Sequence, residues 1–184
     1  MKIFSDKEVS AIAECLIAGK IGILRTDTLY GLVCQTGNES AVERIYRLKN
    51  RDNNKSPIIL IADRQQLFDT PSHVATEFLE TVWPGRVSVV LPSANAPYWV
   101  QRGNESVAYR LPDDIALQTL LAQTGPLIAP SANPQGLLPA RTIEQAIAYF
   151  GDEVDFYVDG GEVTDNIASQ LLLVKANGEV DRLR

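Results

Sequence analysis

Residues 21–32, IGILRTDTLYGL, join a short apolar run to a cluster of polar side chains. Residues 21–24 are typical of a buried strand. Two threonines, an aspartate, a tyrosine and a glycine follow in residues 26–31. In α/β sheets ligands bind beyond strand ends, where hydroxyl and carboxylate groups can hydrogen-bond a small polar molecule and glycine lets the backbone approach it. The same residue types also suit an ordinary turn, so this segment alone leaves both interpretations open.

Apolar periodicity along the rest of the chain predicts strands that alternate with helices. Residues 57–62 (PIILIA) form a run typical of a strand buried on both faces, whereas His73–Val82 has helical spacing. Several strands lie too close in sequence for a purely parallel sheet. We therefore expect one α/β domain over residues 1–184, with a twisted mixed sheet and flanking helices. Other strands are expected at 33–35, 87–91, 106–111, 126–129, 156–158, 170–175 and 179–182. Other helices are expected after caps at Ser5, Asn38 and Thr142, and a further one opens with Asp113 and Asp114.

Composition and charge restrict the class of protein. The 184 residues carry a net charge of −6 with a pI of about 4.8, which argues against broad, non-specific nucleic-acid binding as the main function. No apolar run approaches the roughly 20 residues of a membrane helix, and the first residues show no signal-peptide pattern. Cys15 and Cys34 indicate neither a disulfide framework nor a zinc site. A cytoplasmic enzyme without membrane association is the expectation.

Three cations, Lys49, Arg51 and Lys55, lie in a segment that we expect to be an exposed loop between a helix and a buried strand. Guanidinium and ammonium groups bind phosphate oxygens, so this loop is a candidate triphosphate site. A solvated basic loop is the alternative. The chain has neither a GxxxxGK[ST] nor a GxGxxG motif, so a nucleotide site here would be of another type.

Small and polar residues follow the expected strand at 126–129. Ser131 and Asn133 supply hydrogen-bonding groups there, and small neighbours let a ligand approach the backbone. A plain connection between a strand and a helix is the alternative.

Arg110 lies in the expected strand 106–111, where its side chain can hold a carboxylate with two hydrogen bonds. Pairing with Asp113 or Asp114 is the structural alternative. The chain has one histidine and no clustered Cys/His ligands, which argues against a zinc site and against a Ser-His-Asp triad.

Five short motifs, spread over about residues 20 to 145, occur in an order that is shared with one family. Through them the chain resembles the YrdC/TsaC family, the threonylcarbamoyl-adenylate (threonylcarbamoyl-AMP) synthases. The motifs are RTDTLYGL from Arg25, Lys49-Asn50-Arg51 with Lys55-Ser56-Pro57, Trp83-Pro84-Gly85, Val107-Ala108-Tyr109-Arg110 and Ser131-Ala132-Asn133.

The resemblance implies a YrdC-like fold whose twisted sheet forms a concave ligand groove. It also implies a nucleotidyltransferase reaction in which L-threonine, bicarbonate or CO₂, and ATP give threonylcarbamoyl-adenylate and pyrophosphate. A separate tRNA threonylcarbamoyl-transfer complex would then modify adenosine 37 of tRNAs that read ANN codons.

The resemblance also assigns roles to residues of this chain. Lys49 and Arg51 would be the catalytic cations, facing the departing pyrophosphate. No covalent nucleophile and no protein-bound metal are expected, because positioning and charge neutralisation suffice and Mg²⁺ arrives with ATP. The implied ATP-binding residues are Lys49, Arg51, Lys55, Ser106, Ser131, Asn133 and Arg141; the implied threonine-binding residues are Thr26, Thr28, Tyr30 and Arg110.

The chain departs from the family pattern at three places. Arg25 and Arg86 stand where prolines are usual, and residues 168–170 read ASQ where the family often has PST. Two alternatives stay open. One is an RNA-binding protein without synthase activity, since family members are linked to double-stranded RNA or tRNA binding; the net charge weakens it. The other is a carbamoyl-adenylate activity like that of hydrogenase-maturation proteins, whose zinc-finger cysteines this chain lacks.

Overall fold

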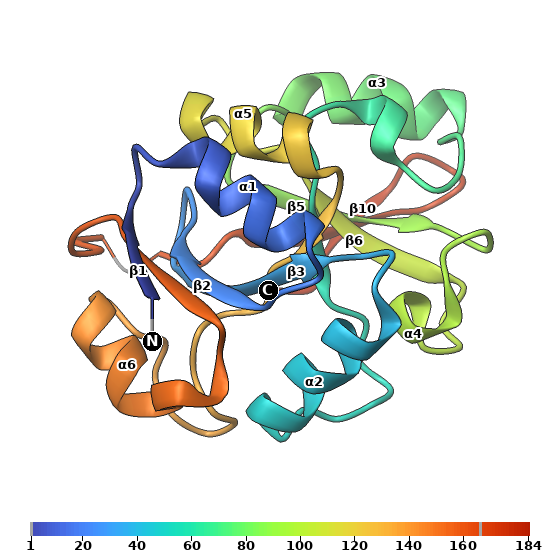
Figure 1. The fold of residues 1–184 in the computed structure, drawn as a ribbon. Helices are drawn as coiled ribbons and strands as arrows, with labels where there is room; N and C mark the ends of the chain where they lie inside the picture. Colours follow the sequence, from blue (N-terminus) through green and yellow to red (C-terminus); the bar gives the residue numbers. More distant parts are fainter. Residues whose placement is uncertain (1, 166) are drawn as a thin grey trace.

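The structure is a computed structural model that describes residues 2–165 and 167–184. Within these residues ten strands form one sheet in the order β1-β8-β2-β3-β7-β4-β6-β5-β9-β10 (Figure 1). Parallel pairs such as β4/β6 and antiparallel pairs such as β2/β3 both occur, so the predicted mixed sheet is confirmed. The strands are β1 Lys2–Ser5, β2 Gly22–Arg25, β3 Tyr30–Gln35, β4 Ile58–Leu60, β5 Val87–Pro92, β6 Ser106–Arg110, β7 Leu127–Ile128, β8 Phe156–Asp159, β9 Gln170–Val174 and β10 Val180–Arg182.

Each face of the sheet packs against its own apolar core. Successive side chains of a strand point to opposite faces, and in β2 Ile23 joins one core while Leu24 joins the other. Two helices that contact each other, α1 and α5, cover the Leu24 face, and α2 and α6 cover the Ile23 face (Figure 1). The helices are α1 Val9–Ile17, α2 Glu39–Lys49, α3 His73–Val82, α4 Tyr98–Gln101, α5 Ile115–Thr124 and α6 Ile143–Phe150, with short 3₁₀ turns at Arg64–Gln66 and Gly151–Glu153.

Side-chain caps start three helices where the sequence predicts them. Asn38 accepts a hydrogen bond from the backbone of Ala41, and Asp114 and Thr142 cap α5 and α6 in the same way. Such caps satisfy backbone N–H groups that a first helical turn leaves unpaired. None of these helices, across the part of the chain that the structure describes, has the length and apolar character to span a membrane.

The N-terminal segment differs from its prediction. Ser5 was expected to cap a helix, but it ends β1, and α1 begins at Val9. The Glu8 carboxylate still accepts from the Ser5 backbone N–H at 2.8 Å, as in a capping box. The chain stays extended because β1, at the edge of the sheet, pairs with β8, with Lys2 opposite Phe156. These backbone hydrogen bonds outweigh the local capping preference.

Two further differences bear on the predicted site. The strand expected at 33–35 begins at Tyr30, so Tyr30 lies within the sheet and is fully buried. Lys49 is the last residue of α2 and is only 5% exposed. The expectation of an exposed loop is therefore wrong for Lys49: the helix continues until Asn50, whose left-handed φ of 50° ends it.

Candidate functional site

A buried ion pair joins the β2–β3 hairpin to the end of β6. Arg110 Nη2 donates to Asp27 Oδ1 at 2.9 Å and to Thr28 Oγ1 at 3.3 Å. The Arg110 and Asp27 side chains are 4% and 5% exposed. Asp27 Oδ2 and Arg110 Nε have no hydrogen-bond partner among the described residues. The pair thus keeps one acceptor and one donor for another polar group. Buried polar atoms normally have a hydrogen-bond partner, so these two atoms are available to a ligand.

Burial and charge oppose each other at this pair. Burial raises the pKa of Asp27 and lowers the pKa of Arg110, while their mutual attraction acts against both shifts. The nearby charges of Arg184 and Arg86 lower the Arg110 pKa further. Because a guanidinium does not deprotonate in proteins, Arg110 stays charged. Asp27, and neither Asp113 nor Asp114, is its ion-pair partner.

Thr26 and Thr28 are both buried in the hairpin connection. Thr26 Oγ1 donates to the Leu29 carbonyl at 2.7 Å and lies 3.2 Å from Thr28 Oγ1. The Thr26 hydroxyl therefore stabilises the connection, as in an ordinary turn. The Thr28 hydroxyl faces Arg110, so the turn places it beside a cation that can bind a carboxylate.

The end of α2 meets the loop after β7 through Lys49. Lys49 Nζ donates to the Ser131 carbonyl, to the Asn133 carbonyl at 2.6 Å and to Asn133 Oδ1 at 3.2 Å. Ser131 Oγ donates to the same amide oxygen at 2.6 Å. Burial and the charge of Arg51 lower the Lys49 pKa to about 8. An ammonium has three N–H donors, and these three acceptors favour its charged form.

A second group of predicted residues surrounds the segment 51–56. Arg51 donates through Nε to the Lys55 carbonyl at 3.3 Å and through Nη2 to the Ser56 carbonyl at 3.0 Å. Ser56 Oγ in turn donates to the Ser106 carbonyl at 3.3 Å. Lys55 is exposed. Arg51 has five N–H donors, so these two bonds leave others for a phosphate.

The Arg110 hairpin and the Lys49 loop lie side by side. Gly31 of β3 bridges to Ser131, which sets the hairpin beside the loop that Lys49 holds. The charge of Arg51 lowers the pKa of Arg184 as well as that of Lys49, and Arg184 acts on Arg110. The charges of Lys49, Arg51, Arg184 and Arg110 therefore lie close enough to influence one another in turn.

Arg184 lies near Arg51 and Arg110 at this candidate site, and no sequence motif indicated it. Its Nη2 donates to the carbonyl and the hydroxyl of Ser169, both at 3.1 Å. The Ser169 hydroxyl also lies 3.0 Å from Ser88 Oγ. Arg184 reaches the site because β9 pairs with β5 and β10 returns along β9. No local pattern marks this lone arginine; only the long-range strand pairing does.

Tyr30 and Arg141 contact a different segment, residues 160–165, which we call the strap. Tyr30 OH donates to the Gly161 carbonyl at 2.8 Å and accepts from the Gly160 N–H at 3.1 Å. Arg141 Nε donates to the Val163 carbonyl at 3.0 Å. In this structure the two side chains therefore hold the strap, and their hydrogen bonds go to backbone groups.

The two arginines that replace family prolines also hold the strap. Arg25 Nη1 donates to the Gly160 carbonyl at 2.8 Å, and Arg86 pairs with Asp165. Their side chains thus fix a neighbouring segment, where a proline would restrict only its own φ.

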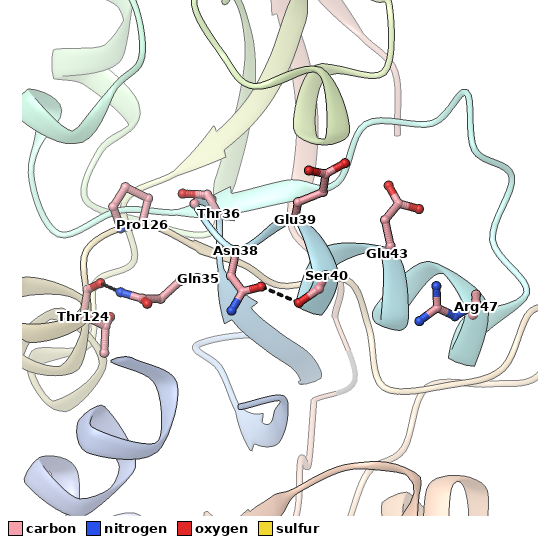
Figure 2. Close-up of a pocket in the computed structure, with 10 residues that line it drawn as sticks. Gln35, Thr36, Asn38, Glu39, Ser40, Glu43, Arg47, Thr124 and Pro126 are labelled. Carbon is pink, nitrogen blue, oxygen red and sulfur yellow. Dashed lines mark hydrogen bonds between the residues drawn. The ribbon is translucent and has the colours of Figure 1, made fainter. Parts of the chain in front are cut away.

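One cavity lies beside the Arg110–Asp27 pair and another lies far from it. The first has a volume of about 540 Å³ and is lined by Thr26, Asp27, Arg25 and Arg86, among others. The second, about 1050 Å³, lies at the N-terminal end of α2 and contains none of the predicted site residues (Figure 2). We place the functional site by its converging cations, because volume alone does not identify chemistry.

Comparison with known proteins links this geometry to one family. Residues 14–184 match the family Sua5_yciO_yrdC, described as telomere recombination. The chain is 36% identical over 160 residues to a threonylcarbamoyl-AMP synthase of Marinobacter nauticus, covering 83% of this chain and 84% of that protein. It is 39% identical over 163 residues to a protein of that name from Pseudomonas aeruginosa PAO1, covering 86% and 88%.

Solved structures show the same fold. Sua5 of P. abyssi, solved as a complex with L-threonine, superposes with a TM-score of 0.90 at 27% identity. It covers all of this chain, which spans only 57% of the Sua5 chain. E. coli YciO superposes with a TM-score of 0.88 at 19% identity, covering all of this chain and 95% of YciO; that likeness concerns the fold alone.

Proposed function

This chain belongs to the Sua5/YciO/YrdC family, and from that premise we propose that it is a threonylcarbamoyl-AMP synthase. The reaction joins L-threonine, bicarbonate or CO₂, and ATP into threonylcarbamoyl-adenylate and releases pyrophosphate. Relatives with this name cover most of the chain. The observation that carries the proposal is the bridge between Gly31 and Ser131, which sets the hairpin that Arg110 contacts beside the loop that Lys49 holds.

We assign the triphosphate to the Lys49 end of the site. Arg51 keeps unused N–H donors and Lys55 is exposed, so both can reach phosphate oxygens. Lys49 holds the loop of Ser131 and Asn133 by three hydrogen bonds, and its charge stabilises the departing pyrophosphate. Ser106 and Arg141 have weaker support, because the Ser106 contact is made by its carbonyl and Arg141 binds the strap.

We assign L-threonine to the Arg110 end. The threonine carboxylate would bind Arg110 near the Thr28 hydroxyl, and the buried free oxygen of Asp27 would accept from a polar hydrogen of the substrate. The threonine amine attacks CO₂ and loses a proton to solvent, or attacks bicarbonate with loss of water; either route gives a carbamate. A carbamate oxygen then attacks the α-phosphorus of ATP, and pyrophosphate leaves. Because the adenylyl group of ATP is transferred, the enzyme is a nucleotidyltransferase. Positioning and charge neutralisation accelerate the reaction, and no covalent enzyme intermediate forms.

Mg²⁺ belongs to the substrate in this proposal. The site offers cations, hydroxyls and carbonyl oxygens, and Mg²⁺ commonly binds substrate phosphates together with waters. Among residues 2–165 and 167–184, no group of three or more His, Cys, Asp or Glu side chains could hold a metal ion. The product would pass to a separate tRNA threonylcarbamoyl-transfer complex.

The test is detection of the product itself. Purified protein with Mg²⁺, ATP, L-threonine and ¹³C-bicarbonate should form threonylcarbamoyl-AMP that is one mass unit heavier than with unlabelled bicarbonate, as measured by mass spectrometry. Arg51→Ala should lose product while keeping its fold. Arg64→Ala is the matched control, because Arg64 makes an exposed ion pair with Glu80 outside the site. Unchanged product formation in Arg51→Ala would contradict the site assignment.

RNA binding without synthesis is the competing function. Arg25, Arg51 and Arg86 supply positive charge, but Arg25 and Arg86 are already bound to the strap. Binding of a phosphate backbone rests on several free cations and weakens steeply with salt. Steeply salt-dependent tRNA binding together with no product formation would favour this alternative.

A further inference from the structure

Arg102 is an arginine in an unusual backbone conformation with an almost buried side chain. It ends α4 with φ 58° and ψ 28°, a left-handed conformation that residues other than glycine seldom adopt. The side chain is 7% exposed, and its Nη1 lies 2.7 Å from Glu43 Oε1 of α2. Its Nε and Nη2 have no partner among the described residues. Backbone strain and a partly unsatisfied buried guanidinium both cost free energy, and such costs commonly accompany a functional role.

The guanidinium lies against Tyr46, a residue of α2 that reaches the segment 51–56. The Cζ atom of Arg102 is 3.8 Å from the centre of the Tyr46 ring, within the range of a cation–π contact. Arg51 also approaches this ring, with its Cζ at 5.8 Å. The Tyr46 hydroxyl donates to the Lys55 carbonyl at 2.6 Å, the same oxygen that accepts from Arg51 Nε.

The end of α4 and the connection after it also hold this segment. Ser56 Oγ donates to the Gln101 carbonyl at 2.9 Å, and the Asn104 amide donates to the Asn54 carbonyl at 2.9 Å. Arg102 lies between these two residues in the chain. Its ion pair with Glu43 therefore links the α4 connection to α2, the two elements between which the segment is held.

We propose that Arg102 is a positioning residue for the phosphate-binding segment. Its guanidinium fixes the Tyr46 ring, and the Tyr46 hydroxyl fixes the Lys55 carbonyl. Arg51 and Lys55 are thereby held in a geometry ready for the ATP phosphates, so less order has to be gained on binding. This inference rests on the proposed function for its link to ATP, whereas the ordering of the segment stands on the contacts alone.

Two substitutions separate positioning from folding. Arg102→Met keeps an unbranched apolar stem but removes the charge and the planar group; Arg102→Gly also removes the side chain but suits the left-handed φ. In both, we expect the KM for ATP to rise about fivefold or more, with the KM for threonine within about twofold of wild type. Arg102→Gly should melt at a higher temperature than Arg102→Met. Arg64→Met serves as the control for loss of an arginine.

A second readout does not need activity. In the ligand-free protein, amide hydrogen exchange of residues 51–56 should be faster in both Arg102 variants, and Tyr46→Phe should have the same effect. If the variants exchange these amide hydrogens at the wild-type rate, the proposal is overturned, even if the enzyme is active. An unchanged KM for ATP in folded variants would also overturn it. If wild type makes no threonylcarbamoyl-AMP, the proposed function fails, and hydrogen exchange still decides the positioning role.

Discussion

At the scale of single residues, a single substitution of Arg110 would remove two interactions at once. We propose that it binds the threonine carboxylate, and it also pairs with buried Asp27 at 2.9 Å. Arg110→Ala should therefore lower the free energy of unfolding by about 3–5 kcal/mol, because it leaves a buried carboxylate unpaired. The measurement is urea unfolding alongside the KM for threonine.

The double variant Arg110→Ala/Asp27→Ala separates the two roles. Removing both charges should recover much of the lost stability. The KM for threonine should stay raised by about tenfold, the effect of losing roughly 1.4 kcal/mol of binding. Recovery of both stability and threonine affinity would show that Arg110 is structural only.

Lys49 gives stability a specific pH dependence. Its pKa is about 8 in the folded protein, against an ordinary value of 10.5. Between pH 8 and 10.5 the Lys49 side chain therefore binds more protons in the unfolded chain than in the folded one. Its contribution makes the free energy of unfolding increase as the pH rises through this range. Below pH 8 the cost of the buried charge is fully present. The gain over this range is about 3 kcal/mol.

Comparison with Lys49→Met isolates this effect, because the other titrating groups are common to both proteins. The difference in unfolding free energy, wild type minus variant, should rise between pH 8 and 10.5. Parallel stability curves over that range would mean that Lys49 keeps its ordinary pKa and that the three carbonyl acceptors outweigh burial.

At the scale of elements, β2 and β8 pack too closely for any side chain at Gly22. A Cβ atom there would lie 2.1 Å from Cζ of Phe156, a fully buried ring of β8. Gly22→Ala should therefore lower the melting temperature, at a cost of about 1–3 kcal/mol for overpacking. Gly37→Ala is the matched control, since no atom lies within 4 Å of its added Cβ. Equal stability of the two variants would contradict the packing of β2 on β8.

Local rules predicted most elements, and tertiary pairing accounts for those they missed. The helix His73–Val82 follows from its apolar period, and the hairpin of β9 and β10 from Asn177-Gly178 between them. β1 was missed because its partner β8 lies over 150 residues away in the chain, with Ile3 opposite Tyr157. No local signal reports a partner that distant.

At the scale of the whole molecule, the sequence predicted candidate site residues but not their arrangement. The predicted residues Lys49, Ser131 and Asn133 lie within hydrogen-bonding distance of one another, although α2 and the loop after β7 are far apart in sequence. Tyr30 and Arg141 instead hold the strap. Arg184 depends on the pairing of β9 with β5. Motif order indicated the candidate residues; only the folded chain shows which of them meet.

The central claim is that these converging cations activate ATP toward carboxylated threonine. The most direct measurement is pyrophosphate release from ATP by purified protein with Mg²⁺ present, with and without L-threonine and bicarbonate, and with Lys49→Ala as the control for contaminating enzymes. Release that requires both co-substrates and is lost in Lys49→Ala is the predicted result. No release from folded wild-type protein, or release that is indifferent to threonine and bicarbonate, would contradict the claim.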